Sequence, residues 1–178
     1  AGPGEIREIP VEKSNLSIGS TPVDLSEEAY AADLFTMEEG TIIVKYTSTS
    51  SYGVQSLFSI ANGTIGNNNE NRHFHVYITP AGVLGTEIRN NDAYLVSAAG
   101  VVTAGEETTV ALKADAEAGE YKFFVNGELV KTYPASGSYR FADDVTGADT
   151  VLIGATKRKG ENAYSFGGTI HNIQVYGT

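Results

Sequence analysis

The sequence contains no cysteine and no tryptophan, and it is poor in positive charge. Without cysteine, the 178-residue chain has no disulfide, no thiol catalysis and no cysteine-ligated zinc. Twelve lysines and arginines stand against 22 acidic residues, which gives a formal net charge of -10. Phosphate binding needs a basic footprint, so this charge excludes a nucleic-acid partner. No signal peptide opens the chain, and no apolar run approaches the roughly 18 residues of a membrane span, so we expect no membrane insertion.

Residues that favour turns and strands are abundant instead. Glycine alone accounts for 20 residues, whereas charged residues make up only 19% of the chain. This composition suits an extracellular all-β domain better than a cytosolic helical one. The length is that of one domain, and we treat residues 1–178 as a single unit that is long enough to bury a core.

Period-two alternation and short apolar blocks predict strands along most of the chain. The predicted strands are Glu5–Ile9, Leu16–Gly19, Thr41–Ser48, Gln55–Ala61, His73–Thr79, Val83–Arg89, Tyr94–Ser97, Thr108–Ala114, Glu120–Asn126, Glu128–Tyr133, Val151–Lys157 and Gly168–Tyr176. A short helix with an acidic first turn is predicted over Asp24–Phe35, and a second helical turn over Phe141–Val145. Many short strands with so little helix predict an all-β fold of two antiparallel sheets packed as a β-sandwich.

Two turns define hairpins. Asn126–Gly127 lies between apolar runs, and a type I′ turn needs positive φ at both of its central positions, which these residues tolerate. Pro80–Gly82 fits a three-residue turn that ends with glycine in the left-handed region. The second turn pairs three residues of one strand with three of the next on one face: Tyr77 with Gly85, His75 with Glu87, and His73 with Arg89.

We expect that face of the hairpin to be open to solvent. Gly85 has no side chain and should leave a hollow beside Tyr77. An aromatic wall, a hydrogen-bond acceptor and a fixed charge are what the floor of a small sugar site needs. A solvated sheet face with an ordinary cross-strand charge pair accounts for the same residues, so the hairpin alone does not choose between the two interpretations.

Several segments resemble known families of β-sandwich. Gly119–Val130 and Phe166–Tyr176 resemble the central hairpin and the last strand of the concanavalin-like lectin superfamily. The segments that narrow the resemblance to the family 40 carbohydrate-binding modules are Glu39–Tyr46, Gln55–Ile60, Glu87–Arg89 and Ala155–Lys159 with Tyr164. That family comprises the sialic-acid-binding modules beside bacterial sialidases. The resemblance extends over nearly the whole chain and implies a concanavalin-like jelly roll.

The resemblance also implies a set of ligand-binding residues. In that family an arginine pair holds the sugar carboxylate, a glutamate accepts amide and hydroxyl hydrogens, and tyrosine and aliphatic side chains cover the ring. Carried over, these residues are Arg89, Arg158, Glu87, Tyr77, Tyr164 and Val54. A guanidinium fork matches a planar carboxylate bidentately, which an ammonium group cannot do. Three consecutive cations leave it open whether Arg158 trades its role with Lys157 or Lys159.

The function implied is that of a non-catalytic module that recognises terminal sialic acid on glycoproteins, glycolipids and mucin. Such a module would target an attached sialidase to its substrate, in a secreted or cell-surface protein of a bacterium. The alternatives are a laminin-G-like adhesion or spacer domain without a sugar site, and a neutral-sugar lectin. We expect no enzyme, because the closest carboxylate cluster, Asp115–Glu120, lies in a turn, where solvated acids are common.

We expect no cofactor and no metal. His73 and His75 have a spacing that zinc can use, with Glu87 as the third ligand, but paired histidines near a glutamate are commoner than a metal site. A structural calcium held by Asp143 or Asp144 occurs in some lectin-like sandwiches, yet no ligand loop of recognisable spacing is present.

Overall fold

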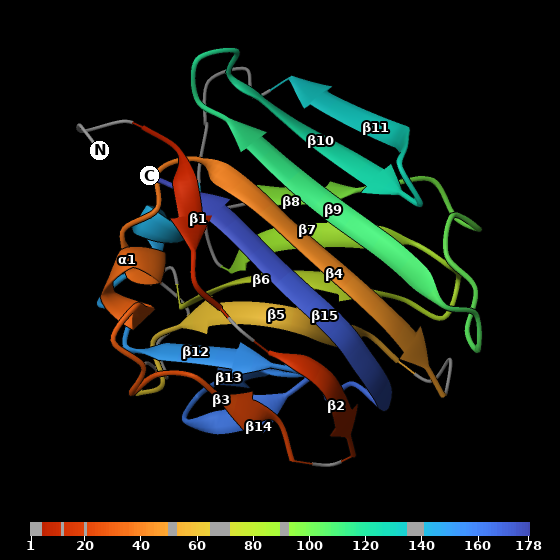
Figure 1. Cartoon of the computed structure of the whole chain (residues 1–178), viewed down its shortest axis with the longest axis horizontal. Helices are drawn as coiled ribbons and strands as arrows, with labels where there is room; N and C mark the ends of the chain where they lie inside the picture. Colours follow the sequence, from red (N-terminus) through yellow and green to blue (C-terminus); the bar gives the residue numbers. More distant parts are fainter. Residues whose placement is uncertain are drawn as a thin grey trace.

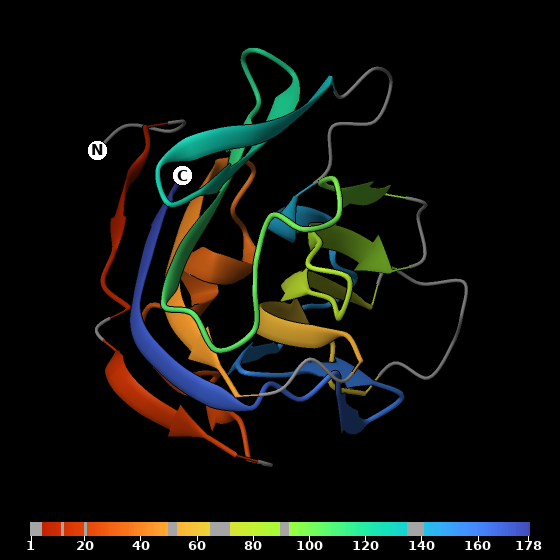
Figure 2. The same ribbon diagram turned by 90° about the vertical axis from the view of Figure 1, so that its right-hand side faces the viewer.

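The computed structural model confirms the predicted architecture of two antiparallel sheets packed face to face (Figure 2). It describes residues 5–11, 13–19, 21–49, 53–64, 72–89, 93–134 and 141–178. For Arg89, Ala93 and Tyr94 it describes the backbone only. None of the helices in these ranges is long and apolar enough to cross a lipid bilayer.

The first sheet has seven strands and passes in front of the second in Figure 1. Its order is β1 (Arg7–Ile9), β15 (Gly168–Gly177), β4 (Gly40–Ser48), β9 (Thr108–Asp115), β10 (Glu120–Val125) and β11 (Glu128–Pro134), with β2 (Ser14–Ile18) also paired to β15. The β10–β11 hairpin turns at Asn126 and Gly127, whose φ values of 49° and 81° confirm the predicted turn.

The second sheet has six strands. Its order is β3 (Val23–Asp24), β12 (Thr150–Ile153), β5 (Gln55–Ala61), β6 (His73–Ile78), β7 (Leu84–Arg89) and β8 (Ala93–Val96). A separate two-stranded hairpin, β13 (Thr156–Arg158) and β14 (Glu161–Ala163), follows β12. The other predicted strands begin and end within two residues of the observed ones, and Val151–Lys157 is the exception.

The hydrophobic core fills the space between the two sheets. Alternate residues of β4 and β9 point inward, among them Val44 and Leu112, and neither is exposed. From the second sheet, Phe58, Phe74 and Val76 meet them and are equally buried. Alternation places the inward side chains of β4 and β9 on one face of each strand, so the apolar pattern there decides which face lies inside.

The predicted helix over Asp24–Phe35 is wrong in its extent, because α1 spans only Ala31–Phe35. Asp24 belongs to β3, where it pairs with Leu152, and its carboxylate accepts a hydrogen bond from the Ser26 N–H at 2.8 Å. A short helix is marginal, and the edge-strand pairing with its capped turn displaces the first half of it. The helical turn predicted near Phe141 is confirmed as η1 (Ala142–Asp144).

The strand predicted over Val151–Lys157 is broken at Gly154. This residue has a φ of +86°, and a Cβ there would lie 2.7 Å from Cγ2 of Ile18, so both the conformation and the close contact require glycine. The chain leaves the sheet at this point and forms the β13–β14 hairpin. The hairpin contacts β5 and β6 on the side of the sheet that faces away from the core.

Candidate functional site

The candidate site lies on the outer face of the six-stranded sheet, around the β6–β7 hairpin. The backbone pairing is the one predicted: Tyr77 opposite Gly85, His75 opposite Glu87 and His73 opposite Arg89. Gly82 at the turn has a φ of +78°, as a three-residue turn that ends in the left-handed region requires.

The expectation that this face is open is wrong. His73, His75 and Tyr77 are each at most 1% exposed. The β13–β14 hairpin covers them, and the chain just beyond it places Tyr164 over His75, with ring centroids 5.6 Å apart and an angle of 17° between the planes. His75 also stacks on Tyr77 at 4.8 Å, so its imidazole contacts a phenol ring on either side.

The hollow expected at Gly85 is filled. A Cβ at Gly85 would lie 2.5 Å from Cζ of Tyr77, so the tyrosine ring occupies the space that the missing side chain leaves. Tyr77 is therefore a buried layer beneath the site, and its position depends on glycine at the facing residue.

Glu87 is held by two hydrogen bonds. Its Oε1 accepts from Nε2 of His75 at 2.9 Å and from Nε2 of His73 at 3.2 Å, while 14% of its side chain stays exposed. Burial by itself would raise the pKa of Glu87, but the hydrogen bonds from the two histidines outweigh it and hold the pKa well below its usual range. Burial lowers the pKa of His73 to about 4. At neutral pH the glutamate is ionised and this histidine is neutral.

Arg158 reaches the same place from the covering hairpin. Its Nη1 donates to the Tyr164 hydroxyl at 2.9 Å, and its guanidinium lies 5.4 Å from the centroid of that ring. Burial is the largest cause of a lowered pKa at His75, and the positive charge of Arg158 acts in the same direction. The guanidinium of Arg158 is therefore close enough to the β6–β7 hairpin to contribute to the lowered pKa of His75.

The register of β13 separates Arg158 from the lysines beside it. Thr156 is buried and forms a hydrogen bond with Ser59 on the outer face of β5. Arg158, two residues later, lies on the same side of the strand, and Lys157 lies on the opposite side. Lys159 is an exposed turn residue with a φ of +52°.

Two predicted site residues, Val54 and Arg89, are not shown in contact with the others. Val54 is half-buried and directly precedes β5. Two residues later, the Ser56 N–H donates to the Tyr164 carbonyl at 2.8 Å, so Val54 is a near neighbour in sequence of a residue that contacts Tyr164. Arg89 occupies the register position two residues after Glu87, and its side chain lies outside what the structure describes. The convergence of Arg89 and Arg158 stays a prediction.

A metal would find three ligands here. One ligand atom each from His73, His75 and Glu87 lies within 4.8 Å of the others, a set that suits zinc. The hydrogen bonds to Glu87 use the same two imidazole nitrogens, however, and the charges of Arg72 and Arg158 oppose added positive charge at the histidines. The geometry is that of a hydrogen-bond cluster beside two cations, which disfavours a divalent ion.

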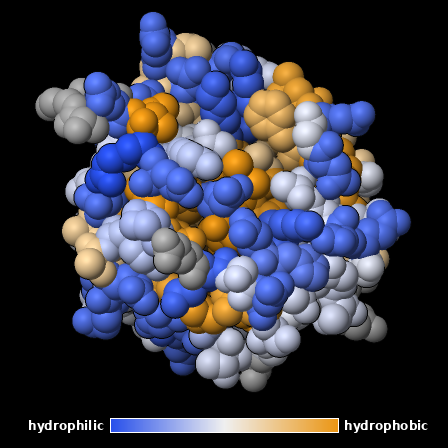
Figure 3. All heavy atoms as spheres, in the orientation of Figure 1, coloured by the Kyte–Doolittle hydropathy of each residue, from blue (hydrophilic) through white to orange (hydrophobic). Residues whose placement is uncertain are grey.

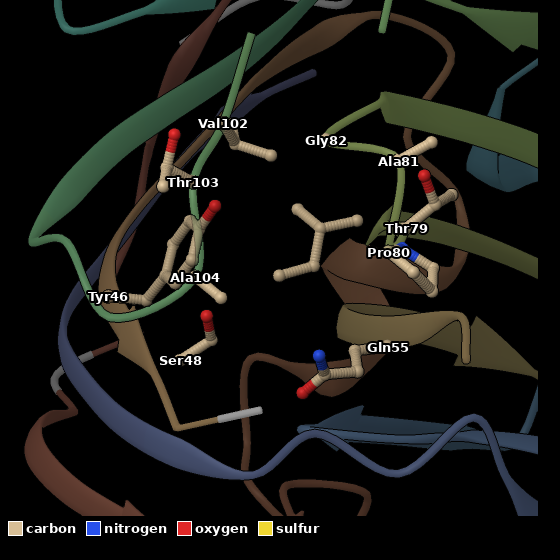
Figure 4. Close-up of a pocket in the computed structure, with 11 residues that line it drawn as sticks. Tyr46, Ser48, Gln55, Thr79, Pro80, Ala81, Gly82, Val102, Thr103 and Ala104 are labelled. Carbon is tan, nitrogen blue, oxygen red and sulfur yellow. The ribbon is translucent and has the colours of Figure 1, made fainter. Parts of the chain in front are cut away.

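A cavity of about 280 Å³ opens at the end of the sandwich, between the two sheets (Figure 4). Tyr46 and Ser48 of β4 line one side, Gln55 of β5 lies below, and the β6–β7 turn closes the other side. No charged side chain lines it among the described residues, so it does not match an acidic ligand. Beside Arg158, in contrast, the hairpin has a hollow of about 320 Å³ that Lys159 and Glu161 also line.

Sequence reasoning missed the residues that support Glu87. The His75 Nδ1 bonds to the Ser56 hydroxyl at 3.1 Å, and a second serine of β5, Ser59, binds the covering hairpin. A signal was present in the sequence: two small polar residues of β5 lie beside His75 of the next strand. This pattern is typical of a covered face rather than a solvated one.

The model of the "Sialidase, N-terminal domain" family matches residues 4–178. The chain belongs to this family. It is 46% identical over 175 residues to the anhydrosialidase of Macrobdella decora and 25% identical over 173 residues to sialidase B of Streptococcus pneumoniae. These matches cover 93% and 89% of the chain but only 23% of each relative, so the chain spans about a quarter of their length.

Solved structures agree with this assignment. The sialidase N-terminal domain superposes on the Ruminococcus gnavus IT-sialidase CBM40 bound to α2,3-sialyllactose with a TM-score of 0.84 and 45% identity, covering 92% of this chain and 90% of the other. It superposes on the leech intramolecular trans-sialidase complexed with 2,7-anhydro-Neu5Ac with a TM-score of 0.81 and 44% identity, covering 92% and 25%. The domain is thus a family 40 carbohydrate-binding module, the non-catalytic binding part of sialidases, and the resemblance noted in the sequence is confirmed.

Proposed function

We propose that this module binds terminal sialic acid at the face formed by β6, β7 and the β13–β14 hairpin. The observation that carries the proposal is a chain of contacts: Arg158 donates to the Tyr164 hydroxyl, the Tyr164 ring stacks on the buried His75, and His75 donates to the ionised Glu87. The R. gnavus module that is 45% identical holds sialyllactose, which supports the same ligand class here.

The roles follow from the chemistry of the sugar. Sialic acid carries a planar carboxylate, and the guanidinium groups of Arg158 and Arg89 would hold it as a bidentate pair. Glu87 would accept a hydrogen from the ligand, and Tyr164 with Val54 would cover apolar parts of the sugar. Tyr77 would act from below, by supporting His75. No step cuts a bond, and no metal or cofactor is needed.

The affinity for one sugar should be modest. A monosaccharide of roughly 20 heavy atoms at about 0.3 kcal/mol each gives at most about 6 kcal/mol, hence a Kd of about 10⁻³ to 10⁻⁵ M. Useful retention on a glycan-coated surface would then come from linkage to another module. We propose that the covalent neighbour is a sialidase catalytic domain, which this module targets to sialylated glycoproteins, glycolipids or mucin outside a bacterial cell.

The test is a titration with 3′-sialyllactose and with lactose, followed by NMR or calorimetry. We expect binding of the sialylated sugar alone, and loss of that binding in Arg89→Ala. Binding of both sugars would identify a neutral-sugar lectin, and binding of neither would leave the laminin-G-like adhesion or spacer domain.

A further inference from the structure

We propose that His73 and His75 are positioning residues which, as neutral hydrogen-bond donors, hold one oxygen of Glu87 and leave the other oxygen for the ligand. The inference rests on the proposed function, because it assigns the ligand contact to Glu87. The inference adds His73 and His75 to the site as residues that do not touch the sugar. They determine which oxygen of Glu87 is left to accept a hydrogen bond from the sugar.

Both donors meet at a single atom. Nε2 of His73 and Nε2 of His75 lie 3.2 and 2.9 Å from Oε1 of Glu87, and the two rings stand at 84° to each other. Among the residues that the structure describes, no donor is bonded to Oε2. A carboxylate has lone pairs on both oxygens, so the two histidines occupy Oε1 and leave Oε2 to accept a hydrogen bond from a ligand.

The hydrogen-bond pattern determines the tautomers. A carboxylate only accepts, so each Nε2 carries the proton. In His75 the bare Nδ1 then accepts the Ser56 hydroxyl at 3.1 Å. In His73 the bare Nδ1 is buried, and no partner for it lies within the described part of the chain, which suits a nitrogen without a proton. Burial lowers the pKa of both histidines, so at neutral pH both rings are neutral and carry the proton on the same atom.

The surroundings keep the pair neutral. Both side chains are fully buried, the charge of Arg72 faces His73, and the charge of Arg158 faces His75. Among the described residues, His75 also contacts the hydroxyl of Ser56 and the rings of Tyr77 and Tyr164. One protonated ring would already cancel the negative charge of Glu87, whereas a neutral pair orients the carboxylate and leaves its charge available to the ligand.

The first experiment reads the tautomers without any sugar. Long-range proton–nitrogen NMR spectra of the whole module, recorded at about pH 7 and about pH 5, should show His73 and His75 with the proton on Nε2 and a bare Nδ1. His171→Gln removes the signals of the third histidine, so the remaining imidazole signals belong to His73 and His75. Signals of an imidazolium, or of a proton on Nδ1, at about pH 7 would overturn the proposal.

The second experiment measures affinity for 3′-sialyllactose. His73→Gln keeps an N–H near the position of Nε2 and should bind within about twofold of the unmodified module, whereas His73→Leu should bind about tenfold more weakly. In His73→Leu the pKa of Glu87 should rise, so affinity should fall further from about pH 7 to about pH 5, where the unmodified module stays constant. Equal affinities and equal pH profiles for the two variants would show a merely structural role.

The two experiments separate this inference from the proposed function. If the unmodified module binds neither sialyllactose nor lactose, the proposed function fails, while the tautomer spectra still report on the hydrogen bonds to Glu87. A zinc titration adds a third arm: micromolar zinc binding that moves the signals of both histidines would make their nitrogens metal ligands and overturn the donor role.

Discussion

The outer faces of the two sheets differ more than their shared fold suggests. On the seven-stranded sheet, β4 alternates between buried and more exposed residues, and Figure 3 shows hydrophilic side chains on that face around hydrophobic ones at its centre. On the six-stranded sheet, all residues of β5 and β6 are buried, including histidines and serines. One sheet has a core face and a solvent face, whereas β5 and β6 of the other are enclosed on both sides.

The difference shows what a covered polar face needs. Partly exposed side chains such as Lys122 and Glu120 can rely on water, although this pair also lies 3.0 Å apart. Under the β13–β14 hairpin, Ser56 and His75 have no exposed surface, and the polar groups bond to each other instead: Ser56 to His75, and His75 to Glu87. Buried polar groups without partners are costly, so the covered face is built as a connected network.

The largest effect should come from the cation that reaches the covered face. Arg158→Ala should abolish detectable binding of 3′-sialyllactose, because it removes a fork that matches the sugar carboxylate, and binding with an expected Kd of about 10⁻³ to 10⁻⁵ M is weak already. Calorimetry or NMR titration measures it. Lys157→Ala, on the other side of the same strand, is the matched control and should bind normally. Equal loss in both variants would mean that net charge, not the fork, binds the sugar.

A smaller but clear loss of stability should follow from Gly85→Ala. The new methyl group would lie 2.5 Å from Cζ of Tyr77, so the ring that supports His75 must move. Overpacking of this kind costs roughly 1–3 kcal/mol. Thermal and urea unfolding measure it, with Gly19→Ala as the control because nothing lies within 4 Å of a Cβ there. An unchanged melting temperature in Gly85→Ala would contradict the tight packing of the enclosed face.

Acid should weaken the enclosed face. The pKa of His73 is lowered to about 4 in the folded protein from 6.5, so between these values the unfolded chain binds more protons and stability falls as the pH falls. The lowered pKa of Glu87 acts in the same direction below 4.5. Melting temperatures from about pH 7 to about pH 4 should decline, and less so in His73→Gln.

The third histidine provides the control for that series. His171 lies on β15 of the other sheet, where its Nε2 bonds to the Thr47 hydroxyl at 2.8 Å. His171→Gln should follow the unmodified module across the series. A flat profile in the unmodified module, or the same flattening in both variants, would contradict the assignment of acid sensitivity to the enclosed face.

The smallest effect should come from the solvent face of the other sheet. Lys122→Ala removes a partly exposed ion pair with Glu120 on β10. Such pairs are worth about 0–1 kcal/mol, so unfolding and sugar binding should both stay nearly unchanged. A loss of stability in Lys122→Ala comparable to that in Gly85→Ala would contradict the difference between the two outer faces.

Local patterns predicted much of the site. The Pro80–Gly82 turn and the apolar alternation determine which residues of β6 and β7 face each other, because a shift by one residue would bury Glu87 in the core. The same reasoning failed at Asp24–Phe35, where short-range helix signals competed with a distant edge-strand partner. It also failed at Gly154, which was included in a strand although it ends one.

The sequence by itself determined the all-β class, the register of the β6–β7 hairpin and the residue types able to bind an acidic sugar, since alternation and turn chemistry act over a few residues. Only the tertiary structure decided that the outer face of the six-stranded sheet is enclosed. It also decided that Tyr77 fills the space at Gly85 and that both histidines bond to one oxygen of Glu87. The cover comes from the β13–β14 hairpin, far from β6 and β7 along the chain, and no local pattern encodes where such a hairpin lies.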